Sequence, residues 1–292
     1  MDKVMVLGSG FMGGGIAQVC AAAGLDVLVW DLSPELIEKS IAKTAAGLDA
    51  RIAKGKETEA HKREILSHLI PCPGLERAAE AELILEVVLE EEDVKRKVLA
   101  EVEGFARESA YLATNTSYIP ISFLAGCLRR PERFIGLHFF GPVPAMKLLE
   151  IIRGDQTADE TLQMGLDFAR RIGKTPVVVN KDTPGFVVNR INAALRLEAY
   201  RIMHEGIASI EDIDQAMKLG LNHPMGPFEL NDMSGIELGL SGLETMYKRT
   251  GEARWKPVPE VYERVERGEL GRKTGKGWYD YSSGEKKPRT DL

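Results

Sequence analysis

The feature that most constrains this chain is a glycine-rich turn near its N-terminus, set between two short apolar runs. The first run, Val4–Leu7, has no polar residue, which is typical of a strand buried on both faces of a sheet. The turn Gly8–Gly13 follows it, and an alanine-rich helical stretch covers Gly14–Ala23 before Gly24 ends it. The second run is Val27–Trp30. Strand, turn, helix and strand within about 30 residues predict a β-α-β unit.

The glycines of this turn have the spacing G-x-G-x-x-G. Gly8 permits the tight turn, Gly10 lets a pyrophosphate approach the backbone, and Gly13 lets helix and strand pack closely. The pyrophosphate would lie at the helix N-terminus beside Phe11 and Met12, because free N–H groups and the helix dipole favour an anion there. We therefore expect a dinucleotide cofactor. A glycine turn that binds no ligand is the alternative.

An acidic residue, Asp31, ends the second apolar run. A carboxylate at this place accepts hydrogen bonds from the adenosine ribose hydroxyls and repels a 2′-phosphate. Leu32 follows it, so no Arg or Lys is adjacent to receive such a phosphate. The sequence therefore predicts NAD rather than NADP. FAD uses the same glycine motif and stays open as an alternative.

Strand and helix patterns alternate along the next part of the chain. The expected strands are Leu83–Val88, Tyr111–Thr114, Phe134–Leu137, Leu148–Ile152 and Pro176–Val179, and the expected helical segments are Leu32–Leu69 and Asp159–Ile172. This alternation predicts an α/β fold, with a Rossmann-type, doubly wound and mostly parallel sheet.

The pattern changes after Pro184 and Gly185, where strand signals stop. Helical periodicity then covers Asn192–Gly206, Ile210–Leu219 and Phe228–Tyr247. We therefore expect an NAD-binding domain over residues 1–183 and an all-helical C-terminal domain over residues 184–292.

Composition excludes several other classes of protein. The 292 residues are 44% hydrophobic and 28% charged with a net charge of −6, which is typical of a globular protein and not of a disordered chain or a general nucleic-acid binder. Cys20, Cys72 and Cys127 are too few and too scattered for a disulfide scaffold, and the five histidines lack metal-ligand spacing. No apolar stretch is long enough for a membrane span and no signal peptide begins the chain, so we expect a cytoplasmic protein.

Two polar residues lie in apolar surroundings, His138 in the segment Gly136–Phe140 and Glu150 in Leu148–Ile152. A buried carboxylate is rare unless it is paired, and a His–Glu pair satisfies both groups. Glu150 would set the imidazole tautomer and raise its basicity, which suits a base that takes a hydroxyl proton during hydride transfer. A structural histidine beside an unrelated glutamate, or a zinc ligand, remains possible from the residue types alone.

Other candidate sites are less specific. Asn115, Thr116 and Ser117 follow an expected strand directly, where open α/β sheets bind ligands, although such residues also cap helices. Basic residues gather in Arg51–Glu64 and Arg264–Arg289. These segments could receive phosphates or could be solvated faces.

Six longer segments share a recognisable pattern: GSGFMGGGIA at 8–17, NTS at 115–117, GLHFFGPVPAMKLLEIIRG at 136–154, DTPGFVVNR at 182–190, EDIDQAMKLGLNHPMGPFEL at 211–230 and GRKTGKGWYDY at 271–281. Together they resemble the L-3-hydroxyacyl-CoA dehydrogenases, and within them the short bacterial 3-hydroxybutyryl-CoA dehydrogenases. The resemblance covers nearly the whole chain. It implies an NAD-dependent oxidoreductase that interconverts (S)-3-hydroxyacyl-CoA and 3-oxoacyl-CoA, with short acyl chains favoured.

The resemblance also implies roles for single residues. His138 would be the catalytic base and Glu150 its support. Ser117 would lie near the substrate oxygen and the nicotinamide, and Asn189 would help to position the substrate. Further matched positions are cofactor-contacting Glu90, Lys95, Asn115 and Lys273, and Lys54 near the CoA phosphates. The helical domain resembles the dimerisation domain of the family, which implies a homodimer.

Two positions depart from the family pattern. Gly141 stands where the family usually has an asparagine close to the active site, and Gly47 stands where a relative has a serine that touches CoA. These departures leave room for a sibling dehydrogenase of a hydroxy compound without CoA. A protein that binds a dinucleotide without catalysis is a further alternative, because fold alone does not establish activity.

Overall fold

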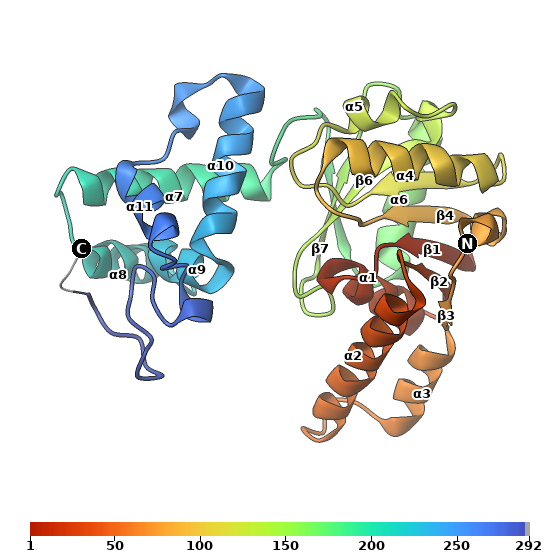
Figure 1. Ribbon diagram of the computed structural model, residues 1–292, viewed down its shortest axis with the longest axis horizontal. Coiled ribbons are helices and arrows are strands. Elements are labelled where there is room, and N and C mark those ends of the chain that lie inside the picture. Colours follow the sequence, from red (N-terminus) through yellow and green to blue (C-terminus); the bar gives the residue numbers. More distant parts are fainter. Residues whose placement is uncertain (290–292) are drawn as a thin grey trace. The chain divides into compact units, whose positions relative to one another are not determined.

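The computed structural model describes residues 1–289, which form two compact units, Met1–Phe186 and a second unit that begins at Val187 (Figure 1). The first unit is an α/β structure. Its strands are β1 Lys3–Leu7, β2 Asp26–Trp30, β3 Leu69–Pro71, β4 Leu83–Glu86, β5 Tyr111–Thr114, β6 Phe134–Phe139, β7 Leu148–Ile152 and β8 Thr175–Val179. Its α-helices are α1 Phe11–Ala22, α2 Pro34–Ile52, α3 Glu59–Ser67, α4 Glu92–Phe105, α5 Ile121–Ala125 and α6 Asp159–Arg171.

The eight strands form one sheet in the order β3-β2-β1-β4-β5-β6-β7-β8. Every neighbouring pair is parallel except β6 and β7, which are antiparallel. The chain leaves β1 on one side toward β2 and returns on the other side as β4, so the sheet is doubly wound, as predicted. In such sheets, ligands bind beyond the carboxyl ends of the strands at this reversal.

Alternate side chains of each strand enter two separate cores, one on each face of the sheet. In β1, Val4 and Val6 join the core beneath α1, α2, α3 and α6, whereas Met5 and Leu7 join the core beneath α4 and α5. Both faces are therefore covered by helices, which explains why the strands are continuous apolar runs. Helices α2 and α3 pack on each other and extend beyond the sheet (Figure 1).

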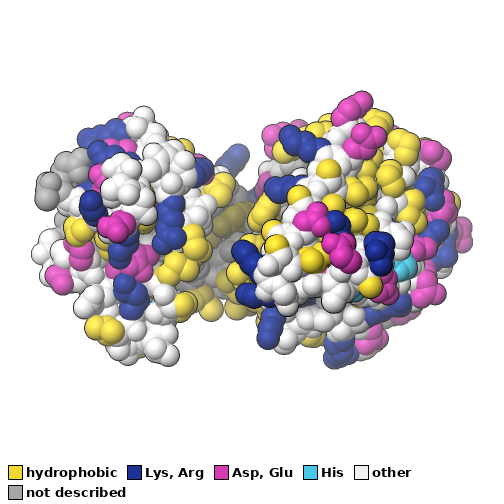
Figure 2. All heavy atoms as spheres, turned by 90° about the horizontal axis from the view of Figure 1, so that it is seen from below, with side chains coloured by type: hydrophobic (Ala, Val, Ile, Leu, Met, Phe, Trp, Pro, Cys, Tyr) yellow, Lys and Arg dark blue, Asp and Glu magenta, His cyan; other side chains and the backbone are white. Residues whose placement is uncertain are grey.

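The second unit has the helices α7 Val188–His204, α8 Ile210–Leu221, α9 Pro227–Ser234, α10 Ile236–Thr250 and α11 Pro259–Glu266. Its centre is a cluster of three buried rings, Tyr200, Phe228 and Trp278, whose centroids lie 5.1–5.7 Å apart. Asn231 Oδ1 accepts hydrogen bonds from the Tyr200 hydroxyl and from Trp278 Nε1. Apolar side chains also remain on the surface of this unit, as Figure 2 shows in yellow.

Several expected element boundaries were wrong; the strand expected over Leu83–Val88, for example, ends at Glu86. The segment Phe228–Tyr247 is two helices, because Gly235 has φ +104° and interrupts the helical backbone. Strand β6 continues to Phe139, so that His138 lies inside the strand and not after it. The end of the expected helical segment Leu32–Leu69 begins β3, a strand of three residues that is too short to show periodicity. Between residues 1 and 289, no helix combines the length and the apolar character that a membrane span requires.

One carboxylate of the second unit links the stability of this unit to pH. Glu269 bonds to Arg264 and Arg289 at 2.6 and 2.7 Å. Burial raises the pKa of Glu269, but these hydrogen bonds outweigh it and lower the pKa from 4.5 to about 2. Glu269 therefore stabilises the folded state above pH 4.5, and this contribution is lost as the pH falls toward 2.

We predict that Glu269→Gln lowers the free energy of unfolding at pH 7 by about 2 kcal/mol. The difference between wild type and variant should shrink as the pH falls from 5 to about 3. Urea unfolding followed by tryptophan fluorescence measures both quantities at each pH. Burial raises the pKa of Asp214 and Asp232 in the same unit, so the comparison must be with wild type at equal pH. A difference that is constant with pH would contradict the prediction.

Candidate functional site

The glycine turn joins the carboxyl end of β1 to α1, and its glycines are required for different reasons. A Cβ at Gly13 would lie 1.8 Å from the carbonyl oxygen of Gly8, so no larger residue fits where the helix meets the strand. A Cβ at Gly10 would meet no atom within 4 Å. The packing of the protein itself therefore leaves the backbone at Gly10 open, which is the space that a pyrophosphate needs. Phe11 and Met12 are the first two residues of α1.

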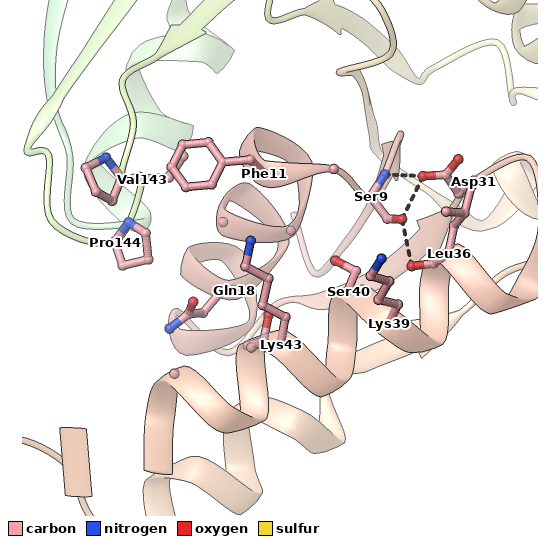
Figure 3. A pocket seen from close by; sticks show the side chains of 16 residues that line it. Ser9, Phe11, Gln18, Asp31, Leu36, Lys39, Ser40, Lys43, Val143 and Pro144 are labelled. Atoms are coloured by element: carbon pink, nitrogen blue, oxygen red, sulfur yellow. Dashed lines mark hydrogen bonds between the residues drawn. The ribbon is translucent and has the colours of Figure 1, made fainter. Parts of the chain in front are cut away.

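Asp31 follows the end of β2, beside this turn. One oxygen of its carboxylate, Oδ2, accepts hydrogen bonds from the backbone N–H and the hydroxyl of Ser9, each at 2.6 Å (Figure 3). Oδ1 accepts the N–H of Leu32 at 2.8 Å. We did not predict from the sequence that Ser9 binds Asp31, although the position of Ser9 inside the glycine turn could have indicated a contact with the end of the next strand. Ser9, Gly10, Phe11 and Asp31 line one cavity of about 350 Å³, and this donor and acceptor set fits NAD.

His138 and Glu150 face each other across the antiparallel pair β6–β7. His138 Nδ1 lies 2.7 Å from Glu150 Oε2, and the two residues are 3% and 0% exposed. The rings of Phe140 and Phe186 pack edge-on against the imidazole. With Glu150 ionised, Nδ1–H donates to the carboxylate and Nε2 carries the lone pair. Nε2 lies 3.0 Å from the hydroxyl oxygen of Ser117, so three predicted site residues form one hydrogen-bonded chain.

The loop that carries Ser117 follows β5 and is held by carboxylates. Glu90 Oε1 accepts the hydroxyl of Thr116 at 2.6 Å and the N–H of Ser117 at 2.8 Å. Burial raises the pKa of Glu90, but the charge of Lys95 and the hydrogen bonds from this loop outweigh it and lower the pKa. Asn115 Oδ1 accepts the N–H of Phe139 at 2.8 Å, which ties the loop to β6 beside His138.

Lys95 is buried and bridges two carboxylates. Its ammonium lies 2.8 Å from Glu86 Oε1 and 3.3 Å from Glu90 Oε2. Glu86, at the end of β4, also accepts the hydroxyl of Thr114 at 2.7 Å. Burial raises the pKa of Glu86, and the Lys95 charge opposes this shift. Sequence reasoning missed Glu86, although a glutamate inside an apolar run was the same signal that identified Glu150.

The remaining predicted residues lie elsewhere. Lys54 is exposed in the turn after α2 and does not line the cavity at Asp31. Asn189 is in the first turn of α7, and Lys273 forms an ion pair with Glu237, both in the second unit. Over residues 1–289, no three His, Cys, Asp or Glu side chains gather in a way that could hold a metal ion.

Comparisons with known proteins match one family along nearly the whole chain. The model of the 3-hydroxyacyl-CoA dehydrogenase NAD-binding domain matches residues 3–183, and the model of the C-terminal domain of the same family matches residues 185–281. The 3-hydroxybutyryl-CoA dehydrogenase of Bradyrhizobium diazoefficiens is 41% identical over 99% of this chain and 98% of its own length. A probable 3-hydroxybutyryl-CoA dehydrogenase of Bacillus subtilis is 39% identical over 96% of this chain and 98% of its own.

A solved structure is also similar to this one. The crystal structure of (S)-3-hydroxybutyryl-CoA dehydrogenase from Ralstonia eutropha has a TM-score of 0.92 and 42% sequence identity. The match covers 96% of this chain and 99% of the other.

The buried pair Glu86–Lys95 generates a stability prediction. Glu86→Gln should lower the free energy of unfolding by about 3–5 kcal/mol, because it leaves the Lys95 ammonium buried without its nearest counter-charge. The double variant Glu86→Gln/Lys95→Met should recover most of this loss, since no buried charge is then left. Urea unfolding measures each value. Glu108→Gln, on an exposed residue of the same unit, is the control. A loss of less than about 1 kcal/mol in the single variant would show that the pair is not a structural requirement.

Proposed function

The chain belongs to the 3-hydroxyacyl-CoA dehydrogenase family, and we propose that His138 is its catalytic base and 3-hydroxybutyryl-CoA its substrate. It is an NAD-dependent oxidoreductase that acts on the CH–OH group of 3-hydroxyacyl-CoA. The observation that carries the proposal for His138 is the hydrogen-bonded chain Ser117–His138–Glu150, in which the histidine and the glutamate are buried. The short acyl chain rests on the names of the similar proteins.

In this mechanism, each residue of the chain has one task. Glu150 accepts the Nδ1–H of His138, so that Nε2 carries the lone pair that takes the proton of the 3-hydroxyl group. The positive imidazole that results is stabilised by the carboxylate beside it. Ser117 Oγ, 3.0 Å from Nε2, donates a hydrogen bond to the same substrate oxygen. NAD, when bound, supplies the acceptor for the hydride that leaves C3.

The cofactor site favours NADH over NADPH on electrostatic grounds. The carboxylate of Asp31 lies where the adenosine ribose hydroxyls bind in this fold, and a 2′-phosphate there would face a negative charge. Ser9 holds this carboxylate in place through two hydrogen bonds. We also assign cofactor contacts to Glu90 and Lys95, which adjoin the Ser117 loop.

We propose a homodimer formed through the helical unit. Large apolar side chains are exposed on its helices, among them Leu219, Leu221 and Leu238, and such surfaces mark protein contacts. We further propose that the protein works in the cytoplasm, in line with its three free cysteines, of which Cys20 and Cys72 are buried. Asn189 and Lys273 keep the substrate and cofactor roles that the family resemblance implies.

The first test is the rate of NADH oxidation with acetoacetyl-CoA, beside NADPH and free acetoacetate. We expect turnover with NADH and acetoacetyl-CoA, with a higher KM for NADPH because of Asp31. Equal rates with free acetoacetate would favour the sibling dehydrogenase without CoA, for which the departures at Gly47 and Gly141 leave room. NADH binding without turnover would favour the non-catalytic alternative.

The role of His138 has its own test. His138→Gln should lower kcat by about 10²–10⁴-fold, because glutamine cannot take the hydroxyl proton. The dissociation constant of NADH, measured by fluorescence, should change by less than about twofold. The matched control is His204→Gln, since His204 also lies 2.7 Å from a glutamate, Glu260, but is exposed in the second unit. Near-normal turnover of the His138 variant would refute the mechanism.

A further inference from the structure

Gly141, which departs from the family pattern, lies beside the ring of Phe11. Gly141 stands three residues beyond His138, where the family usually has an asparagine. In this structure the ring of Phe11 occupies the adjacent space: a Cβ at position 141 would lie 2.7 Å from Phe11 Cε1 and 3.3 Å from Met12 Sδ. Any side chain at 141 would therefore displace the ring. The Phe11 ring can therefore take its observed position because residue 141 has no side chain.

The Phe11 ring lines the cavity that begins at Asp31. Phe11 is 62% exposed, although it is a large apolar residue at the start of a helix in the middle of the site. Val143 and Pro144 line the same cavity and lie beside the ring in Figure 3. An aromatic face that is exposed inside a cavity is a surface against which a ligand packs.

The charges of the cavity come from α2. Lys39 and Lys43 are one helical turn apart and both line it, and Lys43 extends toward Phe11, with Nζ 5.6 Å from the ring centroid (Figure 3). Within the described part of the chain, Lys39 and Lys43 form no ion pair with a carboxylate, and the Phe11 ring is the contact of the Lys43 ammonium. Two unneutralised cations beside an apolar wall suit a ligand that joins an uncharged chain to phosphates. Lys54, the lysine that the resemblance placed near the CoA phosphates, does not line this cavity.

We propose that Phe11 is a specificity-determining residue for the CoA moiety: its ring packs against the pantetheine arm of the acyl-CoA, Gly141 leaves the ring the space to do so, and Lys43 binds the CoA phosphates. This inference rests on the proposed function, because acyl-CoA carries both an uncharged amide chain and phosphates. The dinucleotide takes the other end of the cavity, at Ser9, Gly10 and Asp31. The chain thus replaces a polar contact of the family by an apolar one.

A double-mutant cycle tests the coupling of the two positions. Phe11→Ala removes the ring, and Gly141→Asn displaces it, so each should raise the KM for acetoacetyl-CoA about tenfold, as expected for the loss of one aromatic contact. The double variant should be no worse than either single one, because the same contact is lost only once. If the KM increases of the two single variants multiply in the double variant, the two positions act independently and the coupling is refuted.

Two substrates separate the ring from the lysine. Phe11→Ala should raise the KM for both acetoacetyl-CoA and acetoacetyl-pantetheine, which lacks the nucleotide phosphates. Lys43→Met should raise the KM for acetoacetyl-CoA alone. If Phe11→Ala weakens NADH binding and leaves the KM for acetoacetyl-CoA unchanged, the ring contacts the cofactor and the proposal is wrong. Phe105→Ala, on an exposed phenylalanine of α4, is the matched control and should change nothing.

The failure of this inference can be distinguished from the failure of the proposed function. If the wild type does not reduce acetoacetyl-CoA, the proposed activity fails, and CoA itself becomes the probe. Calorimetric titration with CoA should then show about tenfold weaker binding to Phe11→Ala than to wild type. Equal affinities of the two proteins for CoA, or no binding by either, would refute the assignment of Phe11.

Discussion

The antiparallel pairing of β7 with β6 is the constraint on which the candidate site depends. It sets Glu150 directly opposite His138 in a sheet whose other pairs are parallel. Since side chains alternate along a strand, His138 points to the same face as Phe134, and Glu150 points to the same face as Ile152. Both polar groups are therefore buried on the α4–α5 face, where each forms a hydrogen bond with the other. A one-residue slip of β7 would break this hydrogen bond.

The same face carries a second buried pair, and the two pairs hold one loop between them. Glu86 and Thr114 lie on this face at the carboxyl ends of β4 and β5, and Lys95 reaches them from α4. Lys95 also contacts Glu90, whose other oxygen accepts the backbone of Ser117. Ser117 is thus held beside His138 by the hydrogen bond of its N–H to Glu90, and Glu90 is in turn held by the buried ammonium of Lys95.

Local patterns were sufficient to predict the first β-α-β unit and the doubly wound sheet, because apolar runs and glycine spacing act over a few residues. They were not sufficient where a polar residue has a distant partner. His138 ended the expected strand at Leu137, since a polar side chain in an apolar run looks like a boundary until Glu150 is opposite it. The break at Gly235 was missed because a positive φ has no signal in periodicity. Ser9 and Glu86 were missed because their roles depend on Asp31 and Lys95.

Position 141 shows why a departure from a family pattern is best judged in three dimensions. In the sequence, glycine in place of asparagine is the loss of a polar contact near the active site. In the structure, the space is filled by the ring of Phe11, which lies 130 residues away along the chain. Because a Cβ at 141 would lie 2.7 Å from Phe11 Cε1, the ring can keep this position only while residue 141 is glycine. In our proposal, the polar contact is exchanged for an apolar surface in the cavity, and this changes which part of a ligand the site recognises while His138 stays the same.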